Sequence, residues 1–288
     1  MSLSVFLIET NCDSTTPWFI NKSKGRLMIS SSPIPDAPRR LQEVTQADGF
    51  AARALGVIQR VPDAADDAAV VELLHEAKLA LGAEHAVFAS FVRDDDSKEN
   101  FRFLVACDPV WCLEYQRHGW YVHDAWLLYA QTHSEPECAS RIPLLTKGQR
   151  DARLLAAQYG IASAYIVPAP SGGGLSRLGV LMLGSGHEGY FESDAIASIK
   201  VLARSLAMEL HEWWVREVRR EIIDKTRVTP EDLQLLAFER QGLSTKKIAE
   251  KLNTSTSSVD SRFQRLNAKF NTPTRRATAR LAAEYGLI

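Results

Sequence analysis

Residues 107–130, CDPVWCLEYQRHGWYVHDAWLLYA, bring indole, phenol and carboxylate groups together in one short aromatic-rich segment. Among them, Trp111, Tyr115 and Asp124 could act on the same small molecule. An indole N–H can donate to a carbonyl, a carboxylate can accept from an amide N–H, and aromatic rings can enclose an apolar tail. On spacing alone, the alternative is an aromatic-rich core helix in which Asp124 caps the start of a helix.

A second segment, residues 242–270, is dense in Lys, Arg, Ser and Thr, although the whole chain has a net charge of only −1. Ser244 can cap a short helix, and Asn253 suits a left-handed turn after it. Ser255 or Thr256 can then cap a second helix. Two short helices joined by such a turn are typical of a helix-turn-helix.

The second of these helices carries an apolar stripe beside a polar, cationic face. The apolar stripe, spaced by four, three and four residues, consists of Val259, Phe263, Leu266 and Phe270. An α-helix fits the major groove of B-DNA, where Arg can pair with guanine and Ser can reach base edges or phosphates. The alternative is a solvated basic face on a packing helix. The candidate DNA-binding residues are Lys246, Lys247, Ser257, Ser258, Ser261, Arg262, Arg265 and Lys269.

Charge is divided unevenly along the chain, which favours a polyanion partner for its C-terminal part. Residues 226–288 hold eleven Lys and Arg against six Asp and Glu, a net charge of +5, whereas residues 1–225 carry −6.

A chain of 288 residues with 45% hydrophobic and 24% charged residues is long enough for about two domains. No apolar run approaches the roughly 20 residues of a membrane helix, so we expect a cytoplasmic protein without a membrane partner.

The remaining reactive residues form no metal-binding or catalytic pattern. The seven histidines show no arrangement with Ser, Cys or acidic residues that would supply a nucleophile and its base. The cysteines form no CxxC pair and no zinc spacing with histidine, so we expect reduced packing residues at Cys12, Cys107, Cys112 and Cys138. We therefore predict no catalytic residue, no metal and no cofactor.

Helices and strands that could position these residues follow from periodicity and stop signals. A helix is predicted over residues 66–82, with Gly82 as its stop, and a long one over residues 193–223. On the long helix, Trp213 or Trp214 would be exposed for dimer contact, unless the helix covers the core instead. Strands are predicted at 85–92, 101–107, 164–170 and 177–185. This order indicates an α+β fold: an α/β/α sandwich with an antiparallel sheet, followed by an all-α, four-helix C-terminal domain.

Residues 228–288, which begin VTPEDLQLLAF and end YGLI, resemble the C-terminal helix-turn-helix of the LuxR family of transcription regulators. The resemblance implies that a helix over residues 256–270 enters the major groove. It also implies that the last helix, over residues 275–285, helps to pair two domains. Two positions depart from the family pattern: Asp232 stands where Glu is usual, and Arg262 where His is common.

The aromatic segment resembles the pocket of quorum-sensing LuxR regulators, which bind acyl-homoserine lactones, because Trp111, Tyr115 and Asp124 keep the family spacing. The resemblance implies that these residues, with Cys107 and Trp120, contact a ligand. The departures are Cys107 for an aromatic residue, Ala125 for Pro, Ala139 for Trp, Ala164 for Gly, and Met182 and Gly184 for Ser or Thr. An acyl-homoserine lactone, another small apolar or aromatic signal, and no ligand at all therefore stay open.

We predict a homodimeric transcription regulator of quorum-sensing type that binds a palindromic DNA site. Its expected partners are double-stranded DNA, a small-molecule signal and a second copy of the chain, while contact with RNA polymerase stays open. The alternative is a ligand-independent regulator whose N-terminal domain serves dimerisation or binds a partner protein. The predicted parts are an N-terminal extension (1–48), a sensor domain (49–215), a linker (216–225) and a DNA-binding domain (226–288).

Overall fold

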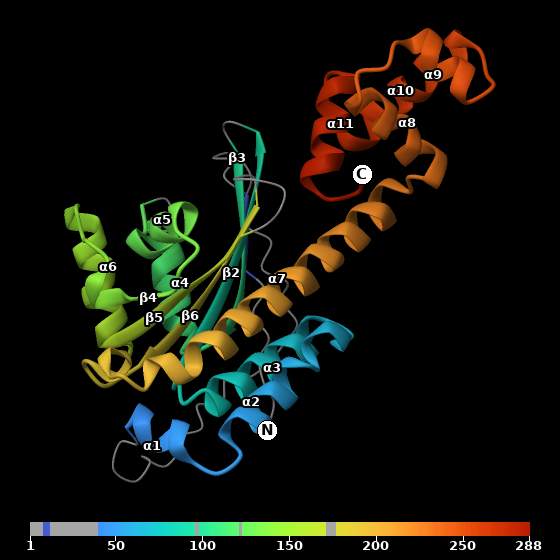
Figure 1. The fold of residues 1–288 in the computed structure, drawn as a ribbon. Helices are drawn as coiled ribbons and strands as arrows, with labels where there is room; N and C mark the ends of the chain where they lie inside the picture. Colours follow the sequence, from blue (N-terminus) through green and yellow to red (C-terminus); the bar gives the residue numbers. More distant parts are fainter. Residues whose placement is uncertain (1–7, 12–39, 96–97, 121–122, 171–176) are drawn as a thin grey trace, which may run out of the picture.

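The computed structural model describes residues 8–11, 40–95, 98–120, 123–170 and 177–288. At its centre lies a six-stranded antiparallel sheet in the order β1-β3-β2-β6-β5-β4 (Figure 1). The four strands predicted from the sequence correspond to β2, β3, β5 and β6. The strands are β1 (Ile8–Asn11), β2 (His85–Asp95), β3 (Lys98–Ala106), β4 (Glu137–Cys138), β5 (Ser163–Pro170) and β6 (Arg177–Ser185).

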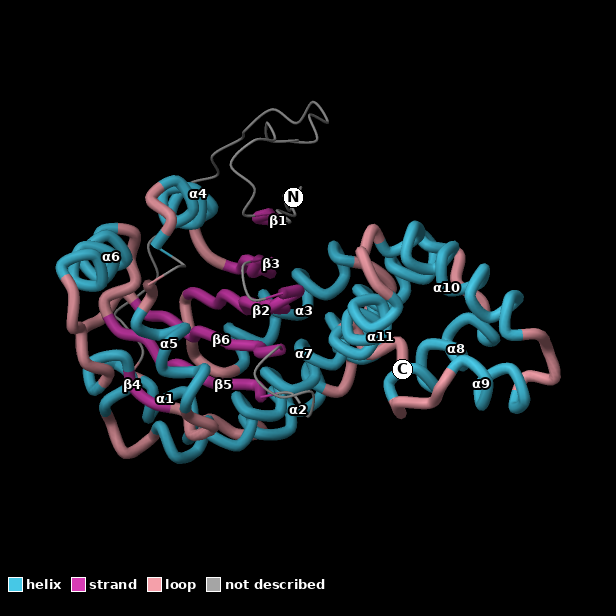
Figure 2. Tube along the Cα trace, turned by 90° about the horizontal axis from the view of Figure 1, so that it is seen from above, coloured by secondary structure: helices cyan, strands magenta, loops and turns pink. Residues whose placement is uncertain are grey.

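Helices cover both faces of the sheet (Figures 1 and 2). Side chains of β2 alternate between the two faces, with Phe88 on one side and Val87 and Ala89 on the other. The Phe88 face packs against α2 (Phe50–Ile58), α3 (Asp67–Ala80) and α7 (Ile196–Thr226). The opposite face packs against α4 (Pro109–Arg117), α5 (Ala125–Thr132) and α6 (Lys147–Gln158). The predicted α+β fold with an α/β/α sandwich is therefore confirmed.

Cross-strand register decides which side chains share the second face. In the antiparallel pair of β2 and β6, Val87 lies opposite Met182, and Ala89 lies opposite Val180. All four side chains are buried in the cluster beneath α4, α5 and α6. Pairing between strands that are distant in sequence thus builds one apolar floor for these three helices.

Helix α3 shows how local signals fix the ends of an element. The Asp66 carboxylate accepts from the Ala69 backbone N–H at 2.9 Å, which satisfies one free donor of the first turn. After the helix, Gly82 has φ +80°, a left-handed conformation that glycine adopts without steric cost. The prediction of a helix that stops at Gly82 is confirmed.

Helix α7 runs unbroken from Ile196 to Thr226, so residues 216–225, predicted as a linker, are helical. The predicted exposure of Trp213 or Trp214 is wrong, because the two side chains are only 1% and 3% exposed. Trp213 Nε1 donates to the Ala64 carbonyl oxygen at 2.9 Å, in the segment that connects α2 and α3. The helix is buried on this side because it covers the core.

Four helices follow α7, as predicted: α8 (Pro230–Arg240), α9 (Thr245–Lys251), α10 (Thr256–Phe270) and α11 (Arg275–Glu284). Thr229 and Asp232 form a reciprocal capping box at α8, and Ser244 and Ser255 cap α9 and α10. Asn253 adopts the expected left-handed conformation, with φ +49°. The core of this region includes Leu235, Ile248, Val259, Phe263 and Leu266.

The predicted N-terminal extension contains β1, which pairs with β3, and α1 (Leu41–Gln46), whose Leu41 is buried. Residues 1–7 and 12–39 of this extension lie outside the described part of the chain.

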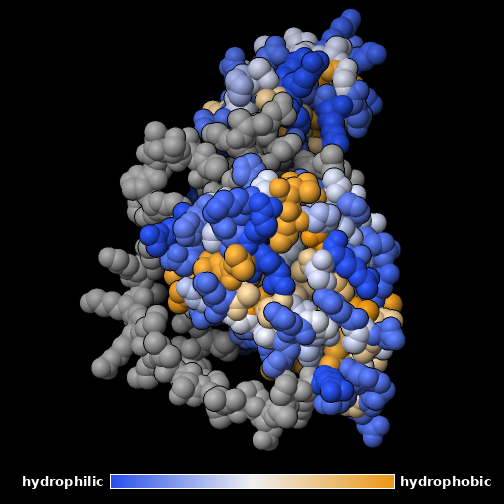
Figure 3. Space-filling model, turned by 90° about the vertical axis from the view of Figure 1, so that its left-hand side faces the viewer, coloured by the Kyte–Doolittle hydropathy of each residue, from blue (hydrophilic) through white to orange (hydrophobic). Residues whose placement is uncertain are grey.

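On the side nearest α6, apolar side chains stand among polar ones at the surface (Figure 3). Within the described residues, every helix is too short or too polar to span a membrane.

Candidate functional site

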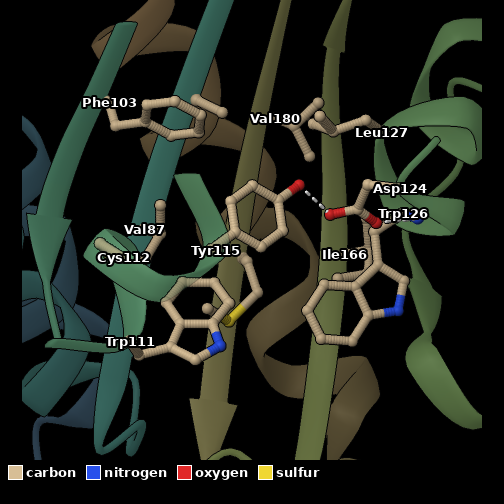
Figure 4. A pocket seen from close by; sticks show the side chains of 12 residues that line it. Val87, Phe103, Trp111, Cys112, Tyr115, Asp124, Trp126, Leu127, Ile166 and Val180 are labelled. Carbon is tan, nitrogen blue, oxygen red and sulfur yellow. Dashed lines mark hydrogen bonds between the residues drawn. The ribbon is translucent and has the colours of Figure 1, made fainter. Parts of the chain in front are cut away.

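A pocket lies between the sheet and helices α4 and α5 (Figure 4), and the space within it, including the part open to solvent, is about 550 Å³. Its walls are nearly all apolar, so it suits a ligand that carries an apolar tail or ring. The lining side chains come from β2, β3, α4, α5, β5 and β6: Val87, Ala89, Phe103, Trp111, Cys112, Tyr115, Asp124, Trp126, Leu127, Ile166, Val180 and Met182.

Asp124 is the one carboxylate in this lining. Its side chain accepts from the Trp126 backbone N–H at 2.7 Å and thereby caps α5. It also accepts a hydrogen bond from the Tyr115 hydroxyl of α4 (Figure 4). Burial raises the pKa of Asp124, while the bonds from Tyr115 and from backbone N–H groups oppose that shift. Helix capping and a role in the cavity, the two interpretations of this residue, are therefore compatible.

Trp111 lies beside Tyr115 on the same helix, with 5.3 Å between the ring centroids. Its side chain is only 6% exposed. Among the described residues and their contacts, its indole N–H has no hydrogen-bond acceptor, although the nitrogen is buried. Because a buried donor without a partner costs about 1–3 kcal/mol, this N–H is a place where a ligand acceptor would be stabilised.

A smaller lobe adjoins the cavity at Trp111, Tyr115 and Asp124 and extends toward α6, with about 300 Å³ of space that includes its solvent-open part. Its polar side chains include Gln149 and Arg153. Both are engaged in the fold: Gln149 donates to the His123 carbonyl at 3.0 Å, and Arg153 donates to the Ile161 carbonyl at 2.9 Å. The indole N–H of Trp111 is therefore the group most available to a ligand in this part of the molecule.

A second candidate site lies on α10 and the start of α9. Lys246 and Lys247 are exposed in the first turn of α9, and Ser257, Ser261 and Arg265 are exposed on α10. The opposite side of α10 is buried, because Val259, Phe263 and Leu266 pack in the C-terminal core. The exposed face combines cations with hydroxyl groups, which is the chemistry that contacts phosphates and base edges.

The other candidates on α10 are partly engaged with α8. Arg262 Nη2 lies 3.5 Å from Asp232 Oδ1, and Lys269 Nζ lies 3.5 Å from Asp232 Oδ2. The Asp232 carboxylate also accepts from the Thr229 backbone N–H. Lys269 donates in addition to the Arg227 carbonyl at 3.0 Å. Ser258 is half-buried, and its backbone N–H is taken by the Ser255 cap. Arg262 and Lys269 therefore link α10 to α8 and to the segment before it, a function that the sequence did not indicate.

A comparison with known families decides the identity of the chain. Residues 66–212, about half of the chain, match the family model of the autoinducer binding domain, a span that includes every residue lining the cavity. The chain belongs to the autoinducer-binding family of LuxR-type regulators. This membership makes it a regulator of transcription and not an enzyme.

Two solved structures of SdiA give the same fold for this LuxR-type regulator, with matches over most of both chains. SdiA in complex with octanoyl-rac-glycerol matches with a TM-score of 0.66 and 14% identity, over 84% of this chain and 98% of its own. SdiA from Escherichia coli matches with a TM-score of 0.66 and 16% identity, over 83% and 99%. CepR2 from Burkholderia cenocepacia has a TM-score of 0.49 and 16% identity, over 57% and 95%. Among curated protein sequences, none matches the chain.

The structure brings three of the five predicted ligand-binding residues together. Trp111, Tyr115 and Asp124 meet at the junction of the two lobes. Cys107 and Trp120 lie outside the described lining of both lobes and pack, partly buried, against the same apolar cluster.

Most of the apolar walls of the cavity could not be predicted from the sequence. The only signal in the sequence for these residues is the alternation of apolar side chains along β2, β5 and β6. That signal is weak, because the register between strands distant in sequence decides which of these side chains line the cavity.

Two departures from the family pattern have a local explanation in this regulator. Met182 lines the cavity and supplies an apolar wall in place of a hydroxyl group. Gly184 lies on the same strand but is closely surrounded: a Cβ atom there would lie 3.2 Å from Cβ of His85 and 3.2 Å from Cγ2 of Ile161. A larger side chain at position 184 would press on both neighbours, so the glycine fits the packing next to the site.

Proposed function

We propose that the N-terminal part of this LuxR-type regulator, residues 49–215, binds a small acyl signal. The C-terminal part, residues 226–288, then binds a palindromic DNA site as a homodimer. The buried N–H of Trp111 carries the ligand proposal, because it lies in a mostly apolar cavity and has no acceptor among the described residues. A ligand with a carbonyl oxygen beside an apolar chain would satisfy that donor and fill the cavity.

Acyl-homoserine lactones and acyl glycerols both meet this description. SdiA, which shares the fold, has been crystallised with octanoyl-rac-glycerol, an ester of a medium-length acyl chain. In the proposed complex the ligand carbonyl accepts from Trp111, and its N–H or O–H groups donate to Asp124. The acyl chain lies against Val87, Val180 and Met182.

Thermal denaturation with a ligand panel tests this proposal. The panel contains acyl-homoserine lactones of several chain lengths together with octanoyl glycerol. A ligand present at 100 times its dissociation constant should add about 2.7 kcal/mol of stability, which raises Tm by several degrees. Purification through a denatured state beforehand removes any ligand that comes from the expression host.

Trp111→Phe is the variant that links such a shift to the proposed hydrogen bond. Loss of one buried hydrogen bond of about 1–3 kcal/mol should weaken binding by about 5-fold to 150-fold. An unchanged affinity would show that the ligand does not use the indole N–H. If no panel member shifts Tm while the protein still binds DNA, the ligand-independent or partner-binding alternative is favoured.

The DNA proposal places α10 in the major groove, with Lys246 and Lys247 near the phosphate backbone. It is supported by the exposed Arg265 and Ser261 on the face opposite the buried stripe and by the local net charge of +5 over residues 226–288. A homodimer would place two such helices about one helical turn apart on a palindrome.

Selection from a random duplex library with the full-length protein would identify a site, and fluorescence anisotropy would then measure its affinity. Binding should weaken steeply with salt, and Arg265→Ala should reduce the salt slope by about 1 if Arg265 contacts a phosphate. Lys147→Ala, at an 84% exposed side chain on α6, is the matched control and should bind like the wild type. Affinity independent of salt, or equal losses in both variants, would contradict the proposal.

A further inference from the structure

Two cysteines face each other where β3 leads into α4. The Sγ atoms of Cys107 and Cys112 are 3.7 Å apart. Asp108 caps the helix by accepting from the Val110 backbone N–H at 2.8 Å, and the helix begins at Pro109. Cys107 is therefore the residue before the cap and Cys112 is the fourth residue of the helix. These two positions pack together in a hydrophobic staple, so the helix start itself holds the sulfurs close.

The two thiols have different surroundings. Cys107 is partly exposed, so a small solute can reach it. Cys112 is buried and lines the ligand cavity. The hydrogen bond with Cys107, together with burial, raises the pKa of the Cys112 thiol, which keeps it protonated. An accessible thiol beside a buried one is the arrangement of an attacking and a resolving cysteine.

We propose that Cys107 and Cys112 form a redox-active dithiol, which a hydroperoxide converts into an intramolecular disulfide in the wall of the cavity. The Cys107 sulfur, as its thiolate, attacks one peroxide oxygen: an S–O bond forms, the O–O bond breaks, and the released hydroxide takes up a proton to form water. The Cys112 sulfur then attacks the Cys107 sulfenic acid. An S–S bond forms, the S–O bond breaks, and the departing hydroxide takes the Cys112 proton as a second water. Two thiols lose two electrons, and one hydrogen peroxide is reduced to two waters.

The second step is favoured by proximity, since the sulfurs need to approach only from 3.7 Å to the bond length of about 2.05 Å. The disulfide would draw Cys112 away from the cavity and toward the end of β3. Because Trp111 precedes Cys112 on the same helical turn, the position of the indole N–H would change as well. That effect on ligand binding rests on the proposed function, whereas the oxidation itself does not.

Hydrogen peroxide treatment of the full-length protein tests the dithiol. The background carries Cys12→Ser, which removes a thiol that lies outside the described residues. Cys138 is the internal reference, because it is buried and its thiol donates to the Phe191 carbonyl at 3.1 Å. Peptide mapping by mass spectrometry should find a Cys107–Cys112 disulfide, as a peptide mass two hydrogens lighter than that of the dithiol. This disulfide should form before Cys138 is oxidised. Dithiothreitol should reverse the change.

Two variants separate the steps. Cys112→Ala keeps the cavity wall apolar and should stop the reaction at a Cys107 sulfenic acid, which dimedone traps. Cys107→Ser should leave Cys112 as slow to react as Cys138. The proposal is overturned if Cys107 and Cys112 oxidise no faster than Cys138. It is also overturned if Cys107 is oxidised without a bond to Cys112, or if the disulfide joins two chains on a non-reducing gel. None of these readouts requires a signal ligand or DNA.

Discussion

Replacement of Trp111 by Phe should leave the ligand-free protein as stable as the wild type, or make it slightly more stable, although a buried side chain becomes smaller. The indole N–H has no acceptor among the described residues, so its removal should recover about 1–3 kcal/mol of desolvation cost. Phenylalanine is about 40 Å³ smaller, and the resulting cavity should cost about 1 kcal/mol. The expected net change therefore ranges from about zero to a gain of about 2 kcal/mol.

Trp213→Phe is the matched control, because the same atoms are removed from a side chain that is 1% exposed. There the indole N–H donates to the Ala64 carbonyl at 2.9 Å. The substitution should cost about 1 kcal/mol for the cavity and about 1–3 kcal/mol for the carbonyl left without its donor, a loss of about 2–4 kcal/mol in all. The two variants should thus differ by at least about 2 kcal/mol.

Urea denaturation followed by far-UV circular dichroism measures both variants, since the signal does not depend on the tryptophans that are replaced. The protein is refolded from denaturant first, so that the cavity holds no copurified ligand. Equal m-values would show that the midpoints report stability alone. If Trp111→Phe loses as much stability as Trp213→Phe, the Trp111 N–H has a partner in solution, and the argument for a ligand acceptor there fails.

Three further predictions concern other parts of the molecule. Burial and the charge of Lys78 lower the pKa of His75 to about 4. Since an unfolded histidine takes up its proton near pH 6.5, the stability contribution of neutral His75 should be lost as pH falls from about 6.5 toward 4. The full pKa shift corresponds to about 3 kcal/mol of unfolding free energy, and we reduce this to about 1–2 kcal/mol because the ring is partly exposed. Urea denaturation at several pH values measures this pH dependence of stability, and His75→Gln should remove it. Gly179→Ala should lower Tm through a loss of about 1–3 kcal/mol, because the new Cβ would lie 2.8 Å from Cζ of Phe88; an unchanged Tm would mean that the ring can move aside. Leu266→Ala should cost about 2–5 kcal/mol in the C-terminal region, measured as an earlier urea transition of the helices, because the side chain is only 1% exposed.

The sequence alone determined part of the local structure of this protein, chiefly the starts of helices and the apolar stripe of α10. A cap at Ser244, a cap at Ser255 or Thr256, and the left-handed turn at Asn253 could be predicted, because each depends on residues a few positions apart. The apolar stripe of α10 could be predicted for the same reason, since i, i+3 and i+4 side chains share one face of a helix. The spacing of Trp111, Tyr115 and Asp124, through its resemblance to the family pattern, likewise indicated a pocket.

Tertiary structure decided what those residues meet. Trp213 or Trp214 was predicted to be exposed unless the long helix covers the core, and contacts with segments far away in sequence bury both side chains. Asp232 engages Arg262 and Lys269 only because α8 and α10 pack together.

The floor of the cavity and the isolation of the Trp111 N–H depend on the pairing of β2 with β6 and on the helices above them. Spacing along a chain fixes which side chains share one face of an element. The atoms that lie opposite that face are fixed by packing between elements distant in sequence.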